Sequence, residues 1–210
     1  MYETFENLPE DRKEQILQVC IEEFAKNGFG NTSTNTIVKR LGISKGLLFL
    51  YFKNKVHLYL YLIDYLIKIY YDKFFSLFPN QKPTEFIEIF NFIGDFYKVL
   101  IIENPYILVF FLKMEMNVPP EIKQEIDFLR NEYHERFLKN LNMNYLRKDI
   151  NIQKMLDLLH MASYHVGQMI LSDYDGDMDC FKKYADKYIR EYNEYIDIIK
   201  LGAFEVTVHG

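Results

Sequence analysis

The chain has 210 residues, of which 49% are hydrophobic and 26% are charged, and its formal net charge is −5. This composition is typical of a globular protein with enough apolar material for one or two compact cores, and it argues against a disordered chain. Cys20 and Cys180 lie far apart within helical patterns. This spacing argues against a disulfide framework, so we expect a reduced protein in the cytoplasm. The acidic, non-apolar opening segment predicts no signal peptide.

The first predicted helix covers residues 9–26. Pro9, Glu10 and Asp11 suit a first turn, because proline is tolerated there and acidic side chains complement the helix dipole. Apolar residues then repeat at helical spacing, and Asn27-Gly28 supplies a C-terminal stop.

Two short helices follow, separated by a tight turn. Thr32 or Ser33 is predicted to cap the first of them, and Gly42 ends it. Ser44 is predicted to cap the second, which runs from Lys45 to about Phe52. This arrangement predicts a helix-turn-helix over residues 33–52.

The charge reverses in this part of the chain. Residues 24–63 contain six Lys or Arg and no Asp or Glu, although the whole chain is acidic. A basic surface of this kind favours a polyanionic partner such as DNA.

The segment 56–78 is long enough to span a bilayer, but Asp64, Lys68, Asp72 and Lys73 interrupt it. Such charges are costly at a membrane centre, so we expect a long helix packed in protein and no membrane partner. Further helices are predicted at 84–103, 105–116, 120–141, 152–172 and 178–204, with no strand or repeat. The predicted fold is all-α with about nine helices: a DNA-binding domain over residues 1–55, then a ligand-binding and dimerisation domain over residues 56–210.

The helix-turn-helix region resembles the head of the TetR family of bacterial transcriptional regulators. The resemblance covers about the first 60 residues, and the remainder resembles the family only in the number and order of its helices. The residues that carry it are Phe24-Ala25-Lys26-Asn27-Gly28-Phe29, Thr32-Ser33, Ile37-Val38, Leu41-Gly42-Ile43-Ser44-Lys45-Gly46, Leu48-Phe49, Tyr51-Phe52 and Lys55.

The candidate DNA contacts come from the residues and from this resemblance. Uncharged hydrogen-bonding side chains at a helix N-terminus suit phosphate binding, although one or two of them could simply cap the helix. They are Thr32, Ser33, Thr34, Asn35 and Thr36. Lys45 is the first candidate for reading a guanine, Gly46 permits close backbone approach, and Leu47 suits a thymine methyl.

The remaining DNA candidates are implied by the resemblance. Phe49 stands where the family has a phosphate-binding tyrosine, so it either packs against the DNA or turns inward. Tyr51 keeps a hydroxyl at the neighbouring family contact, and Lys55 resembles the family's phosphate-binding lysine. Lys39, Arg40 and Lys53 have no such match, and diffuse attraction to DNA is expected of them.

In the rest of the chain, aromatic and polar side chains could line a pocket for an apolar or aromatic ligand, or they could form only a core. The pocket candidates are Phe96, Tyr97, Phe110, Phe111, Met114, Tyr133, Phe137, His160, Tyr164 and Gln168. His160 and His165 are spaced off a shared helical face, so neither a metal site nor a cofactor is predicted.

Two apolar stripes on the last two helices predict a homodimer, with packing inside one protomer as the alternative. The interface candidates are Leu159, Val166, Gly167, Tyr184, Tyr188, Tyr192 and Tyr195.

Together these features predict a transcriptional regulator, and we expect it to repress transcription rather than activate it. It would bind a palindromic double-stranded DNA operator as a homodimer and be released by an unidentified small-molecule effector. The alternative is a constitutive DNA-binding protein whose filled core senses nothing. An enzyme is not predicted, because the sequence has no Gly-rich phosphate loop, nucleophile-histidine pair or metal-ligand spacing.

Overall fold

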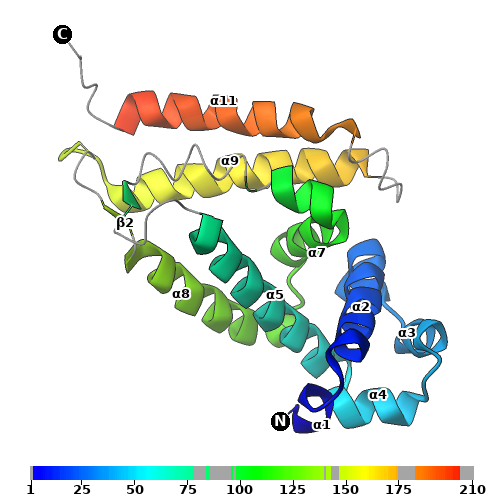
Figure 1. The fold of residues 1–210 in the computed structure, drawn as a ribbon. Coiled ribbons are helices and arrows are strands. Elements are labelled where there is room, and N and C mark those ends of the chain that lie inside the picture. The colour runs from blue at the N-terminus through cyan, green and yellow to red at the C-terminus, as the bar shows by residue number, and fades with distance from the viewer. Residues whose placement is uncertain are drawn as a thin grey trace. The chain divides into compact units, whose positions relative to one another are not determined.

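The computed structural model describes residues 2–77, 84–85, 96, 98–139, 141–142, 147–174 and 183–203. Within these residues the regular secondary structure is helical except for one two-residue parallel ladder, which confirms the all-α class (Figure 1). Its contacts divide it into two compact units: residues 1–73 with 106–133, and residues 74–105 with 134–210. The predicted domain boundary after residue 55 therefore falls inside the first unit.

The first unit begins with the head, which we define as helices α1 to α4. These are α1 (Glu3–Glu6), α2 (Glu10–Asn31), α3 (Thr34–Leu41) and α4 (Lys45–Phe52). The sequence did not predict α1. Its Phe5 is fully buried, and the ring centroid lies 4.6 Å from that of Phe52, so α1 covers one end of α4.

Two glycines shape the head. The helical backbone of α2 is broken at Gly28, where φ is 69°, so the predicted stop appears as a kink before a last short turn. Gly42 ends α3 with φ of 64°. There the Gly42 amide donates to Lys39 and the Ile43 amide donates to Val38, a Schellman arrangement that requires a left-handed residue.

Buried apolar side chains join the three larger helices of the head. Ile16 and Cys20 on α2, Ile37 on α3, and Leu48 and Phe52 on α4 are completely inaccessible to solvent. Burial also raises the pKa of the Cys20 thiol, which packs as a small hydrophobic side chain.

The rest of the first unit is formed by α5 (Lys55–Leu77) and by α7 (Pro105–Met116), with a 3-10 turn (Pro120–Ile122) leading into α8 (Lys123–Lys139). The two-unit division passes through α5 and α8 near residues 73 and 133. Among the described helices, none combines the length and the apolar character that a bilayer crossing requires.

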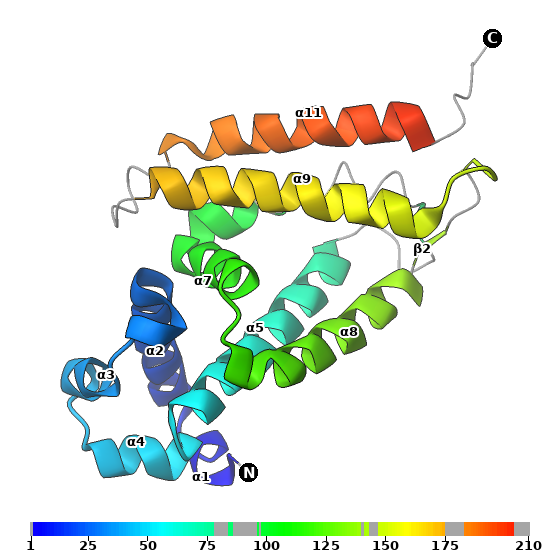
Figure 2. The same ribbon diagram turned by 180° about the vertical axis from the view of Figure 1, so that it is seen from behind.

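The second unit contains α9 (Ile152–Asp173) and α11 (Ala185–Ala203), which lie side by side and run in opposite directions (Figures 1 and 2). It also contains β1 (Thr84–Glu85), paired in parallel with β2 (Leu141–Asn142). Neither strand was predicted. Most of the helix predicted at 84–103 falls outside the described residues, but residues 98–103 are helical.

Candidate nucleic-acid interface

The exposed side of α4 carries a short set of side chains that we call the reading face: Lys45, Gly46, Leu47, Phe49 and Leu50. Lys45 and Gly46 are exposed, and Leu47 and Phe49 are half-buried. Leu50 has 62% of its surface accessible to solvent. The helix starts at Ser44, whose Oγ accepts a hydrogen bond from the Leu47 amide at 3.1 Å, as the sequence predicted for this cap.

Phe49 stays at the surface instead of turning into the core. The Lys45 ammonium lies 5.6 Å from the centre of its ring, which brings the one cation of the reading face beside an aromatic side chain. Residues four apart share a helical face, so the two side chains would approach a partner together.

The predicted polar run divides into one inward and four outward residues. Thr32 has only 3% of its surface exposed, and its hydroxyl lies 2.6 Å from the Gly28 carbonyl and 3.1 Å from that of Glu23. Its hydroxyl therefore holds the α2–α3 turn, in place of the predicted phosphate contact. The other four members are exposed or half-buried: Ser33, Thr34, Asn35 and Thr36.

Tyr51 was predicted to offer its hydroxyl to DNA, but its side chain is buried. Only 7% of its surface is exposed, and its ring lies 5.9 Å from that of Phe5 and 6.2 Å from that of Phe52. The structure thus uses the ring in the core of the head, at the contact with α1.

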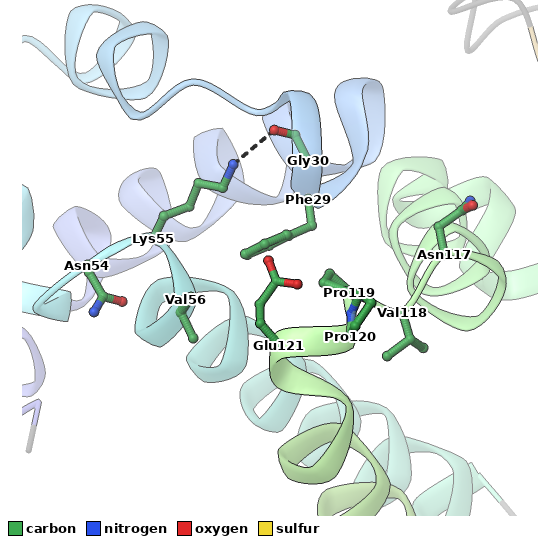
Figure 3. Close-up of a pocket in the computed structure, with 10 residues that line it drawn as sticks. All are labelled: Phe29, Gly30, Asn54, Lys55, Val56, Asn117, Val118, Pro119, Pro120 and Glu121. Carbon is green, nitrogen blue, oxygen red and sulfur yellow. Dashed lines mark hydrogen bonds between the residues drawn. The ribbon is translucent and has the colours of Figure 1, made fainter.

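The ammonium group of Lys55 is engaged in hydrogen bonds within the protein (Figure 3). Its Nζ donates to the carbonyls of Gly30 at 3.1 Å and Thr32 at 3.0 Å, and it lies 4.7 Å from the ring centre of Phe29. Burial lowers the pKa of this lysine, and the charge of nearby Glu121 opposes that effect. As placed, Lys55 closes the α2–α3 turn, whereas the resemblance implied a phosphate contact.

Lys55 and Glu121 also line an open groove of the first unit (Figure 3). Its other walls come from the end of α2, the start of α5 and the segment between α7 and α8. The lining residues are Phe29, Gly30, Asn54, Lys55, Val56, Asn117, Val118, Pro119, Pro120 and Glu121.

The charge of Arg40 is balanced by two carboxylates, Glu22 and Glu23, which lie just before the region 24–63 that contains no Asp or Glu. Its guanidinium is 2.7 Å from a Glu22 oxygen and 2.8 Å from a Glu23 oxygen. The hydrogen bond with Glu22 raises the pKa of Arg40. Although burial alone would raise the pKa of Glu22, the hydrogen bonds from Arg40 and Gln18 outweigh it and lower that pKa. Arg40 therefore ties α3 to α2, in place of the predicted diffuse attraction to DNA.

The turn after α4 has an unusual backbone at Lys53, which the sequence did not indicate. Lys53 has φ of 64° and ψ of −53°, and the Asn54 amide donates to the Phe52 carbonyl at 2.6 Å. These values describe a γ-turn, which is strained for a residue with a side chain. Asn54 then caps α5, because its Oδ1 accepts from the His57 amide at 2.9 Å.

Leu50 is the residue of the reading face that sequence reasoning missed. It lies in the uninterrupted apolar run 47–52, where composition cannot separate the buried side from the exposed one. The signal was the helical spacing, because Leu50 follows Gly46 by four positions and Leu47 by three.

The pocket candidates are divided between the two units. Phe110 and Met114 are buried in the first unit, Phe111 is half-buried there, and the Tyr133 hydroxyl donates to Asp64 at 3.3 Å. Phe110 is a core residue, since its ring lies 5.3 Å from that of Tyr59 and 6.4 Å from that of Phe24.

In the second unit, Phe96 is buried, but three candidates on α9 are exposed: His160, Tyr164 and Gln168. The Gln168 amide donates to the Tyr164 hydroxyl at 3.1 Å. Tyr97 and the side chain of Phe137 lie outside the described residues. A shared pocket therefore stays a prediction. Among the described residues, no cluster of His, Cys, Asp or Glu is placed to hold a metal ion.

Four of the seven predicted dimer residues are buried within the single chain. Tyr188 and Tyr192 are 2% and 5% exposed, and Val166 and Gly167 are buried. The Tyr188 hydroxyl also donates to Asp173 at 3.0 Å. The other candidates keep accessible surface: Leu159, Tyr184 and Tyr195.

A different apolar surface on these two helices is exposed. Leu158 and Met161 on α9 are 52% and 63% accessible, and Ile198 and Leu201 on α11 are 68% and 73% accessible. Leu158, Met161 and Ile198 line one groove together. We call this set of four residues the α9–α11 apolar face.

Comparison with known proteins places these features in a family. The family model for bacterial regulatory proteins of the tetR family matches residues 16–62, which include the kinked end of α2, the turn and the reading face. Two HTH-type transcriptional regulators of Bacillus subtilis also match. YuxN is 35% identical over 72 residues, covering 34% of this chain and 23% of YuxN. YerO is 28% identical over 149 residues, covering 63% of this chain and 52% of YerO. The matches thus span about a quarter and about half of these relatives.

Solved structures share the fold over nearly the whole chain. A TetR family transcriptional regulator from Chloroflexus aurantiacus aligns with a TM-score of 0.68 at 21% identity, covering 97% of this chain and 98% of that one. SmeT, the repressor of a Stenotrophomonas maltophilia multidrug efflux pump, aligns with a TM-score of 0.64 at 17% identity, covering 96% of each chain. These proteins are transcriptional regulators and not enzymes, which agrees with the class predicted from this sequence. Residues 16–62 thus match the tetR family of bacterial regulatory proteins, and the described part of the chain has the fold of TetR family transcriptional regulators.

Proposed function

We propose that this regulator is a repressor that binds a palindromic operator as a homodimer and is released by an apolar or aromatic small molecule. The observation that carries the proposal is the reading face. It presents a cation and apolar side chains on a helix held by a capped start and a fixed left-handed turn. Such a helix suits the major groove, where the first residues of a recognition helix meet base edges.

The dimer part of the proposal rests on the α9–α11 apolar face. Four large apolar side chains, each more than half exposed, are costly in water and suit a protein partner. A second copy of the chain is the natural occupant, because two-fold pairing buries the same surface on both subunits. Two heads would then reach two half-sites about one helical turn apart.

The effector part has less support within this chain. FadR from Bacillus subtilis, solved in complex with stearoyl-CoA, aligns with a TM-score of 0.64 at 13% identity over 89% of this chain and 96% of FadR. An apolar ligand fits the aromatic content of the chain, which is 17%. The packing of Phe110 against Phe24 and Tyr59 favours the alternative of a constitutive DNA-binding protein with a filled core.

Selection of bound duplexes from random DNA tests the DNA-binding part. The wild-type chain is expected to enrich a motif with two-fold symmetry. Lys45→Ala is expected to relax the preference at one position per half-site, because Lys45 is the hydrogen-bonding side chain of the reading face. The matched control is Lys68→Ala, which removes an exposed charge from the C-terminal half of α5 and should leave the motif unchanged. Enrichment of no common motif by the wild-type chain would contradict the proposal.

Thermal unfolding tests the effector part, with stearoyl-CoA and unrelated aromatic compounds as probes. A ligand that binds the folded chain raises its stability by RT ln(1 + [L]/Kd). The same compound should release the selected duplex in a binding assay. A panel that neither stabilises the chain nor releases the DNA would favour the constitutive alternative.

A further inference from the structure

The reading face has very few groups that can form hydrogen bonds with a base. Of its five residues, Gly46 has no side chain, and Leu47, Phe49 and Leu50 are apolar. Lys45 is the remaining member. The Ser44 hydroxyl next to it accepts from the Leu47 amide in the helix cap, and Tyr51 on the following turn is buried.

Leu50 is the main apolar contributor. Its side chain is 62% exposed, and its position three residues after Leu47 and four after Gly46 places it beside them on the helix surface. The missing side chain at Gly46 leaves this part of the face open, since a Cβ there would meet only Ser44 Oγ, at 3.9 Å. Leu47 and Leu50 can therefore approach a partner as one apolar surface.

The charge around this surface restricts what the partner can be. Lys39, Lys45 and Lys53 are exposed, and residues 24–63 hold no carboxylate. These cations attract a polyanion electrostatically, whereas they do not favour binding of an apolar protein surface. The apolar group that a DNA duplex displays in its major groove is the C5-methyl group of thymine.

We propose that this chain recognises its operator mainly through thymine methyl groups, with Leu47 and Leu50 each in contact with a thymine of the half-site. Lys45 supplies the one polar base contact, and Phe49 lies beside it. Leu50 is thus a specificity-determining residue. This inference rests on the proposed function, because it names the bases that the same site reads.

The test removes methyl groups from the DNA one at a time. In the duplex selected from random DNA, each half-site thymine is replaced by deoxyuridine, which pairs as thymine does but lacks the C5-methyl. At two positions per half-site we expect a loss of affinity of roughly threefold to fivefold, the usual effect of one buried methyl group. Deoxyuridine outside the contacted positions should have no effect.

A variant then shows which side chain makes each contact. With Leu50→Ala, deoxyuridine should no longer weaken binding at one of the two positions, while the effect at the other persists. Leu47→Ala should give the reverse pattern. Phe128→Ala on α8 is the control, because Phe128 is 68% exposed but lies outside the head, and its deoxyuridine profile should match the wild type. Circular dichroism checks that each variant is folded.

The outcomes separate this inference from the proposed function. If no duplex is enriched, the proposed function fails and the thymine contacts fail with it. If a duplex is enriched but deoxyuridine is tolerated at every position, only the methyl contacts are overturned. A deoxyuridine effect that Leu50→Ala and Leu47→Ala leave unchanged would also overturn them, because the loss would then come from the DNA itself.

Discussion

Lys39 and Arg40 are neighbours in the sequence, but the structure gives them different surroundings. Arg40 is paired with Glu22 and Glu23, whereas Lys39 is exposed. Sequence reasoning treated both as diffuse positive charge, because the carboxylates that face Arg40 lie on another helix. The basic surface offered to DNA is therefore smaller than the six cations of residues 24–63 suggest.

Arg40→Ala is expected to lower the free energy of unfolding by about 1–3 kcal/mol, since it leaves the nearly buried Glu23 carboxylate without its cation. Lys39→Ala should change it by less than about 0.5 kcal/mol, as is usual for exposed sites. Urea denaturation at pH 7 measures both. Equal stabilities of the two variants would contradict the structural role of Arg40.

The lowered pKa of Glu22 predicts how this interaction depends on pH. A carboxyl group whose folded pKa lies below its ordinary value of 4.5 stabilises the fold above that value, and the contribution disappears as pH falls through the folded pKa. Glu22→Gln should therefore be less stable than the wild type at pH 7, and the difference should shrink below pH 4.5. Urea denaturation from pH 7 to pH 3 measures this difference. A gap that stays constant over the range would show that Glu22 is not the titrating group.

At the level of helices, the sequence predicted the end of α3 and the start of α4. Gly42 ends α3 in the left-handed conformation, and Ser44 caps α4 through its side chain. The cap of α3 is different. Ser33 occupies the N-cap position but makes no capping hydrogen bond, and the hydroxyl of Thr32 binds back to α2. A residue type indicates that a cap is possible, but the chain direction before the helix decides whether the hydroxyl reaches the amide.

These two serines give a matched pair. Ser44→Ala should destabilise the head by about 1 kcal/mol, because it removes the hydrogen bond to the Leu47 amide. Ser33→Ala should destabilise the head by only a small fraction of that amount, since no such hydrogen bond is lost. Thermal unfolding of the two variants under one buffer condition gives the comparison. The assignment of the caps is wrong if Ser33→Ala is the more harmful change.

At the level of the whole molecule, the structure changes the surface to which the proposed dimerisation is assigned. Tyr188 and Tyr192 were predicted at the interface, but they are buried within the single chain. Amphipathic stripes showed that both helices bury a face, and the sequence could not say whether the partner was the other helix or a second chain. The large apolar side chains of these helices that stay more than half exposed are Leu158, Met161, Ile198 and Leu201.

The double variant Met161→Glu with Ile198→Glu should convert dimers into monomers, because it places charges on the α9–α11 apolar face of both subunits. Operator affinity should fall by about 100-fold or more as the two heads lose their linkage. Sedimentation equilibrium measures the first effect and DNA binding the second. Phe128→Glu is the control, since Phe128 is equally exposed but lies on α8. A double variant that remains dimeric would exclude this face.

The sequence by itself determined the helical class, the order of the helices, the turn at Gly42 and the location of the DNA-binding head. These features depend on local spacing, residue type and backbone freedom, which a sequence displays directly. Tertiary structure alone decided that Arg40 faces Glu22 and Glu23, that Thr32 and Tyr51 turn inward and that Leu50 stays exposed. These outcomes depend on which surfaces meet when separate helices pack, and that information lies in contacts between residues far apart along the chain.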